Sequence, residues 1–162
     1  MPPGDPVRSI RTPIRLEYDY RPGAAQSEFL RGLARGKLIG ARAGHDGPVY
    51  IPPRGADPRS ARMLDEFVEV KDTGTVVTFS ITRVPSPNIA LTPPYAAISV
   101  LLDGAGLAFF HVLRGCALED VRIGMRVRAR WAAELRPDVW SIECFEPTGE
   151  PDVPQARLRD FS

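Results

Sequence analysis

The residues best spaced for chemistry lie in segment 36–60, which reads GKLIGARAGHDGPVYIPPRGADPRS. Four positions in it are spaced as two C-x₂-C pairs, the arrangement with which cysteines hold a structural zinc ion in a zinc ribbon. They are occupied by Ala43, Asp46, Asp57 and Ser60. Alanine has no donor atom, and two carboxylates with one hydroxyl are a poor ligand set for zinc. We therefore predict a degenerate zinc ribbon that binds no metal.

His45 offers one alternative metal site, because it lies beside Asp46 and could approach Asp57. A His-Asp-Asp group without a fourth ordered ligand is more typical of a solvated polar loop than of a zinc site. The sequence thus predicts no metal and no other cofactor.

His111 is the only other histidine and the strongest candidate for a catalytic base. It lies among Phe109, Phe110 and Val112, where a hydrogen-bonded histidine at a strand end is the simpler interpretation. No G-x-S-x-G nucleophile motif accompanies it, and Cys144 lies in an alternating, strand-like segment. We expect no catalytic residue; the alternative is an acyl-CoA hydrolase or lyase that uses His111.

Arg126, Arg128 and Arg130 alternate with apolar residues and so share one face of an expected strand. Such a face binds single-stranded nucleic acid when aromatic rings lie between the cations, but Trp131 falls on the opposite side. Two interpretations remain open. The arginines pair with nearby carboxylates on a solvated face, or they contact the phosphates of coenzyme A.

The composition indicates a globular protein with one domain of ordinary size. The chain has 162 residues, 43% of them hydrophobic, with 17 prolines, 14 glycines and a net charge of +1. This near-neutral charge disfavours nucleic acid, and no apolar stretch is long enough to span a membrane. Two cysteines cannot build a disulfide framework, and the N-terminus lacks a signal-peptide core, so we expect a cytoplasmic protein.

The hydrophobic pattern predicts a mainly β protein: a five-stranded OB-like barrel preceded by one N-terminal helix and the degenerate ribbon. The helix is expected over 24–35, where Phe29, Leu30 and Leu33 form an apolar stripe. Strands are expected at 77–82, 95–102, 107–112, 125–131 and 140–144. An open sandwich is the alternative to the barrel.

The same pattern divides the chain into four parts. Residues 1–22 form an extended arm, and residues 23–62 the helix with the ribbon segment. Residues 63–147 form the OB-fold domain, and residues 148–162 a C-terminal tail. The arm carries scattered apolar residues, so we expect it to lie on a surface, either of its own domain or of a partner.

The order of these features resembles a known family. The shared features are Phe29 in the helix, Gly36 with Leu38, the sequence Pro52-Pro53-Arg54, Pro94-Tyr95 before an apolar strand, and the element from Leu118 to Val127. Together they resemble the bacterial and archaeal rubredoxin-like zinc-ribbon plus OB-fold proteins that accompany thiolase-like enzymes. The resemblance covers roughly residues 24–146, and the loss of the ribbon cysteines is its main departure.

The resemblance implies a non-catalytic accessory subunit. It would form a hetero-oligomer with a thiolase-like catalytic subunit, a thiolase or a retro-aldolase, that acts on acyl-CoA in bacterial steroid side-chain or lipid degradation. We predict a partner interface at Phe29, Leu33, Tyr50, Pro52, Pro53 and Arg54, and acyl-CoA contacts at Phe109, Phe110, Arg126 and Arg128. For the helix, burial in the chain's own core is the alternative. For Pro52-Pro53-Arg54, the alternative is that it only shapes the loop. A single-stranded nucleic-acid-binding OB module is the alternative function.

Overall fold

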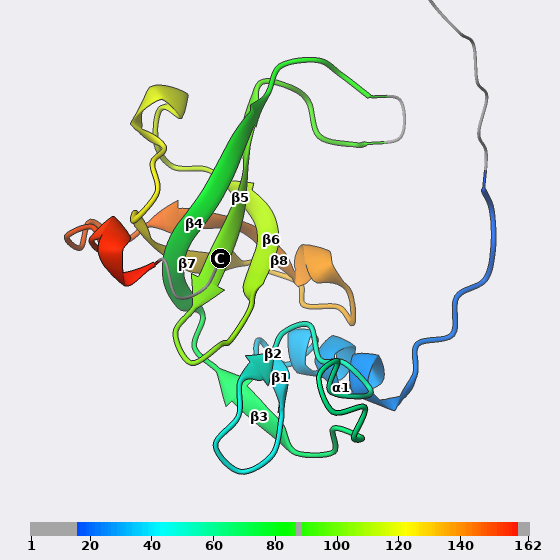
Figure 1. The fold of residues 1–162 in the computed structure, drawn as a ribbon. Coiled ribbons are helices and arrows are strands. Elements are labelled where there is room, and N and C mark those ends of the chain that lie inside the picture. Colours follow the sequence, from blue (N-terminus) through cyan, green and yellow to red (C-terminus); the bar gives the residue numbers. More distant parts are fainter. Residues whose placement is uncertain (1–15, 87–88, 159–162) are drawn as a thin grey trace, which may run out of the picture.

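A computed structural model describes residues 16–86 and 89–158. They form a small antiparallel sheet with one helix against it, and a closed five-stranded barrel next to this sheet (Figure 1). None of the helices in these two ranges is long and apolar enough to cross a membrane.

Helix α1 (Ala24–Leu33) forms where the apolar stripe predicts it, and it ends slightly earlier than expected. Phe29 and Leu33 are 5% and 0% exposed, so the stripe is buried. Gly36 follows with φ of +69°, a backbone conformation that favours glycine, and its N–H donates to the carbonyl of Leu33. The helix therefore stops because the chain turns at this glycine.

The small sheet has the strand order β2-β1-β3. Its strands are β1 (Leu38–Arg42), β2 (Val49–Tyr50) and β3 (Phe67–Val70), and both neighbours of β1 are antiparallel to it. The sheet thus continues to Val70, past the division at residue 62 that the sequence suggests. The segment between β2 and β3 carries Pro52-Pro53-Arg54 and the second pair of ribbon positions.

The barrel confirms the predicted fold class. Its strands are β4 (Thr73–Thr82), β5 (Tyr95–Leu102), β6 (Ala108–Leu113), β7 (Arg126–Trp131) and β8 (Ile142–Pro147). They close in the order β4-β5-β6-β8-β7. Short 3₁₀ turns η1 (Leu118–Asp120), η2 (Val139–Ser141) and η3 (Gln155–Arg157) complete the described elements. As expected, Val127 and Ala129 of β7 point inward and are buried.

Two expected strand positions differ in the structure. Trp140 lies in η2 rather than in the last strand, and it is 52% exposed. Phe79 pairs with buried Ile98 yet stays 38% exposed, after a register shift between Val76 and Thr78. Figure 1 shows one end of β4 and β5 rising beyond the other barrel strands.

One hydrophobic core joins the small sheet and helix to the barrel. It includes Phe29 and Leu33 of α1 as well as Phe109 and Phe145 of the barrel. The rings of Phe29 and Phe109 meet edge to face with centroids 6.2 Å apart. Because the helix packs against the barrel as well as against β1, the two parts hold each other in place.

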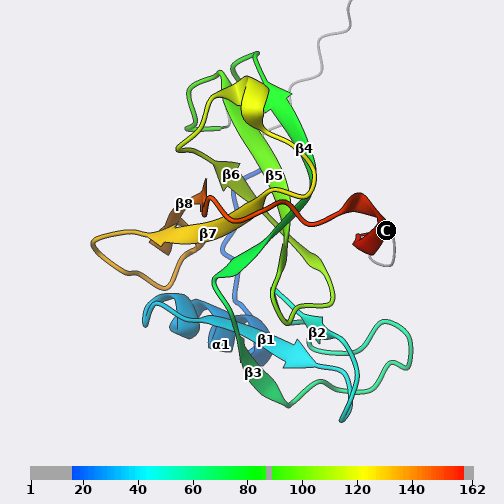
Figure 2. The same cartoon turned by 90° about the vertical axis from the view of Figure 1, so that its left-hand side faces the viewer.

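The C-terminal segment runs along the barrel in Figure 2 and is tied to it. Arg122 forms a two-pronged ion pair with Asp152, and the Val153 N–H donates to the Gly124 carbonyl over 2.9 Å. Gly124 has φ of +94°, and a Cβ there would lie 2.5 Å from the Val153 oxygen. Only glycine permits this close approach.

The described part of the N-terminal arm, residues 16–22, contains no helix or strand. Leu16, Tyr18 and Tyr20 are 63% to 79% exposed, and the arm leaves the body at the start of α1 (Figure 1). The Tyr20 hydroxyl donates a hydrogen bond to Gln26, and the Ser27 hydroxyl of the helix donates to the Pro22 carbonyl over 3.4 Å. The rest of the predicted arm lies outside the described residues.

We predict that Phe145→Ala destabilises the protein by about 3–5 kcal/mol, because Phe145 is fully buried where β6 meets β8. Phe110→Ala is the matched control. Phe110 is 68% exposed, so its truncation is expected to change stability by less than about 0.5 kcal/mol. Urea denaturation measures both. Equal losses in the two variants would contradict the placement of the core.

Candidate functional site

Three of the four ribbon positions come together in the fold. Ala43, Asp57 and Ser60 line one cavity of about 350 Å³ between β1 and the loop that follows β2. Asp46 lies outside this cavity and pairs with His45, whose Nδ1 is 2.9 Å from the carboxylate. The side chains of that pair are 96% and 94% exposed. His45 and Asp46 therefore form a solvated turn, as one interpretation of the sequence expects.

The Asp57 carboxylate organises the loop. Oδ1 accepts hydrogen bonds from the Tyr50 hydroxyl over 3.0 Å and from the Arg59 N–H over 3.2 Å. Oδ2 accepts from the hydroxyl of Ser60 over 2.6 Å and from its N–H over 3.2 Å. These hydrogen bonds, led by the Ser60 hydroxyl, hold the pKa of Asp57 below its usual value. Burial and the Asp57 contact raise the pKa of Tyr50.

The residues at these positions do not fit a zinc ion. Ala43 supplies no ligand, and both oxygens of Asp57 already accept hydrogen bonds from the protein. Within residues 16–86 and 89–158, no group of three or more His, Cys, Asp or Glu side chains is arranged to hold a metal. Hydrogen bonds to the Asp57 carboxylate connect β2 to the following loop, and they do not include Ala43 or Asp46 of the first pair.

A groove of about 580 Å³ lies on the other side of this loop, against the first turn of α1. Ala24 and Ala25 of the helix form one wall, and Pro53, Met63 and Phe67 line the rest. Met63 is 76% exposed and Phe67 36% exposed, and the two lie together at this groove. Arg54 lies at the groove with its guanidinium carbon 5.6 Å from the centre of the Tyr50 ring.

The structure divides the six predicted interface residues into two groups. Phe29, Leu33 and Tyr50 are at most 5% exposed and belong to the chain's own core. Pro53 is buried but lines the groove, whereas Pro52 and Arg54 are exposed. The sequence analysis missed Met63 and Phe67. Met63 lies in a loop, where no periodicity marks an exposed apolar residue, and Phe67 is the first residue of β3.

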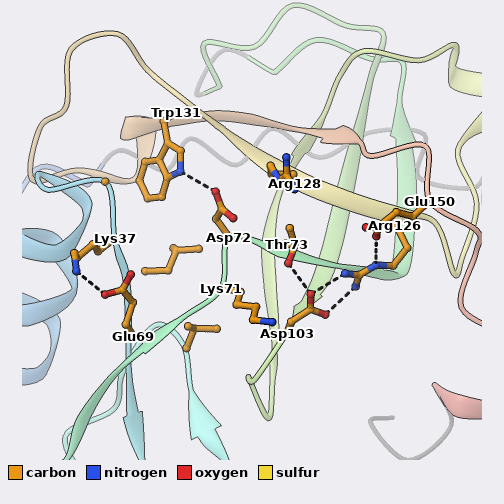
Figure 3. A pocket seen from close by; sticks show the side chains of 13 residues that line it. Lys37, Glu69, Lys71, Asp72, Thr73, Asp103, Arg126, Arg128, Trp131 and Glu150 are labelled. Carbon is orange, nitrogen blue, oxygen red and sulfur yellow. Dashed lines mark hydrogen bonds and ion pairs between the residues drawn. The ribbon is translucent and has the colours of Figure 1, made fainter.

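A second cavity, of about 630 Å³, lies between the small sheet and the barrel and is lined mostly by charged side chains (Figure 3). Arg126 makes a two-pronged ion pair with Asp103 at 2.7 and 2.8 Å and a third contact with Glu150. Thr73 also donates to Asp103. The Arg126 guanidinium lowers the pKa of Asp103, and Asp103 in turn raises the pKa of Arg126.

Arg126 is therefore occupied, while other cations of this cavity remain available. The Arg126 side chain is 16% exposed, whereas Arg128 and Lys71 are exposed and form no ion pair within the described part of the chain, although the charge of Lys71 helps to lower the pKa of Asp103. Lys37 is paired with Glu69, and the Trp131 indole donates to Asp72 (Figure 3). Arg126 thus follows the interpretation in which the arginines pair with carboxylates, and for Arg128 the contact with coenzyme A stays a prediction.

The other predicted ligand contacts lie away from this cavity. Phe109 is 3% exposed in the barrel core, and Phe110 is 68% exposed on the outer side of β6. Arg130, the third arginine of the stripe, pairs with Glu143 at 2.9 Å and also with Glu146. The structure therefore brings Arg126 and Arg128 to one cavity and separates both from the two phenylalanines.

His111 is 6% exposed and surrounded by aromatic rings, and it lines none of the cavities described above. Burial lowers its pKa. A base that substrate cannot reach performs no proton transfer, so this conformation does not favour His111 as a catalytic residue.

These features define a mainly β protein with an OB barrel and a small helix-and-sheet subdomain. Residues 67–132, from β3 through β7, match the model of the ChsH2 C-terminal OB-fold domain. Over these residues the chain is similar to that family's domain. No curated protein is significantly similar to the chain.

Two solved structures share the fold over most of the chain. One is a DUF35-family protein of unknown function from Sulfolobus solfataricus, with a TM-score of 0.59 and 19% identity over 77% of this chain and 86% of that one. The other is the Ltp2-ChsH2(DUF35) aldolase, with a TM-score of 0.60 and 23% identity over 78% and 98%. These likenesses confirm the fold that the sequence resemblance implies.

We predict that Asp57→Asn lowers the melting temperature and that the chelator EDTA leaves it unchanged in both forms. The hydrogen bonds favour the ionised carboxylate, so its stabilising contribution is full above the unfolded pKa of about 4 and is lost as the pH falls through the lower folded pKa. The difference between the two proteins should therefore shrink in acid. Asp46→Asn, in an exposed turn, is the control and should melt like the wild type. A large loss of stability in EDTA would show that a metal holds the loop.

Proposed function

We propose that this chain is a non-catalytic accessory subunit that binds and stabilises a catalytic subunit of the thiolase fold, a thiolase or a retro-aldolase. The match to the ChsH2 OB-fold model and the likeness to the Ltp2-ChsH2(DUF35) aldolase support an aldolase complex as the setting. The partner supplies the nucleophile or base, and this chain supplies a docking surface.

The observation that carries the proposal is the groove beside α1. A chain that buries Phe29 and Leu33 completely leaves Met63 and Phe67 exposed at the rim of an apolar cavity. Exposed apolar residues grouped in this way mark interaction sites in soluble proteins. Arg54 adds a cation held over an aromatic ring, and arginine is enriched among the residues that dominate binding energy.

The buried members of the predicted interface support this surface from below. Phe29 and Leu33 fix α1, and therefore one wall of the groove, on the barrel. Tyr50 contacts Arg54 through its ring and Asp57 through its hydroxyl. A surface that is rigid before binding loses less entropy when the partner docks.

The charged cavity is the proposed contact for acyl-CoA. Arg128 and Lys71 present exposed cations suited to the phosphates of coenzyme A. Arg126 does not contact the ligand directly but holds Asp103 in place through their ion pair. Phe109 is part of the barrel core and supports this side of the chain from inside. Exposed Phe110 is free to line an acyl tunnel completed by the partner. The proposed setting is steroid side-chain or lipid degradation in the bacterial cytoplasm, which rests on the family resemblance.

The nucleic-acid alternative is less well supported. OB folds bind oligonucleotides over their second and third strands, which here are β5 and β6. The sequences of these strands, YAAISVLL and AFFHVL, contain no lysine or arginine. Phosphate binding needs such cations.

Co-expression with a thiolase-like catalytic subunit should give a complex that co-purifies. We predict that Met63→Lys weakens this complex at least about tenfold, because it places a charge in the apolar groove. Isothermal titration calorimetry measures the affinity.

Ile123→Lys is the matched control, since Ile123 is an exposed apolar residue before β7 that does not line the groove. It should bind like the wild type. Two independent proteins that do not associate at micromolar concentration, with full enzyme activity in the absence of this chain, would overturn the proposal.

A further inference from the structure

His111 lies inside a box of aromatic rings. Its imidazole is stacked on Phe109 at a centroid distance of 6.0 Å and meets Phe145 edge to face at 5.9 Å. Trp140 closes the box from η2, with centroids 5.8 Å apart and an interplanar angle of 73°. Three different elements, β6, β8 and η2, thus converge on one titratable side chain.

One nitrogen of the imidazole lacks the partner that a charged histidine needs, although the ring has backbone hydrogen bonds with Val139 and Val112. Its Nδ1 is buried and has no hydrogen-bond partner in the described structure. The facing residue on β5 is apolar Ile98, and α1 contributes Phe29 to the same aromatic cluster. A buried polar atom without a partner costs free energy, and a buried charge without one costs far more.

The nearest acids and bases of the β7–β8 loop are engaged with that loop. The Asp138 carboxylate accepts from the Trp140 N–H over 2.5 Å, and Arg136 is paired with Glu134. On β8, Glu143 and Glu146 pair with Arg130 of β7. None of these carboxylates is therefore free to accept a hydrogen bond from a protonated His111.

The Trp140 side of the box depends on His111. The indole is 52% exposed, and among the described residues its aromatic contact is with the imidazole. The turn itself is stiff, because the Ser141 hydroxyl donates to the Arg136 carbonyl and accepts from the Arg136 N–H. Trp140 and its turn therefore move as one small unit.

We propose that the protonation state of His111 controls the position of the β7–β8 loop. The neutral imidazole holds Trp140 against the barrel, and protonation releases it. The imidazolium needs water or an acceptor, and the shortest route to water is displacement of the half-exposed Trp140. The loop opens in mild acid, while β6 and β8 stay in the barrel.

The direction with pH follows from the burial. Burial lowers the pKa of His111, outweighing backbone hydrogen bonds with Val139 and Val112 that act in the opposite direction. The closed loop is therefore fully favoured above the unfolded pKa of about 6.5, and this preference is lost as the pH falls below it.

The test follows Trp140 in a Trp131→Phe background, which leaves Trp140 as the sole tryptophan of the chain. Acrylamide quenching is measured from about pH 7.5 to about pH 5, the range in which histidine titrates. The quenching constant should rise about twofold, since the ring passes from 52% exposed to fully exposed. The His111 NMR signal should titrate with the same midpoint, below about 6.5.

His111→Phe keeps an aromatic ring that cannot titrate, and its quenching constant should not change with pH. If the larger ring of His111→Phe disturbs folding, His111→Gln serves as the control. Its side chain does not titrate either, so the quenching constant should again be independent of pH. His45→Gln removes the exposed histidine and should retain the full response. A flat profile in the wild-type loop, or an equal rise in the His111 variants, would overturn the proposal.

Discussion

The Asp57 carboxylate is the contact on which the candidate docking surface depends. It collects hydrogen bonds from β2 and from its own loop, and so connects the two sides of a segment that has the spacing of a zinc ribbon. A zinc ion stabilises such a segment through four ligands. Here hydrogen bonds to a charged acceptor, which are stronger than neutral ones, hold the loop of the second pair to β2.

The shared hydrophobic core makes this surface part of the whole molecule. Phe29 touches Phe109, so the helix that forms one wall of the groove is positioned by the barrel. The Asp57 loop forms the opposite wall through Pro53 and Met63. The OB barrel thus serves as a rigid base for this proposed docking surface.

The sequence predicts the elements better than it predicts the surface. Alternation identifies the barrel strands, and the stripe of Phe29 and Leu33 correctly marks one helical face. Periodicity shows only which side chains face together, not what covers them, so the core and interface alternatives for this helix stay open until the fold is known. The Arg126–Asp103 pair joins residues distant in sequence, and no local pattern reveals it.

Hydrogen–deuterium exchange of the complex with its catalytic partner tests the central claim most directly. Binding at the groove should slow exchange in residues 24–29, 52–55 and 63–67, and EDTA should leave this protection unchanged. Protection confined to the barrel strands, or protection that disappears in EDTA, would contradict a metal-free docking groove organised by Asp57.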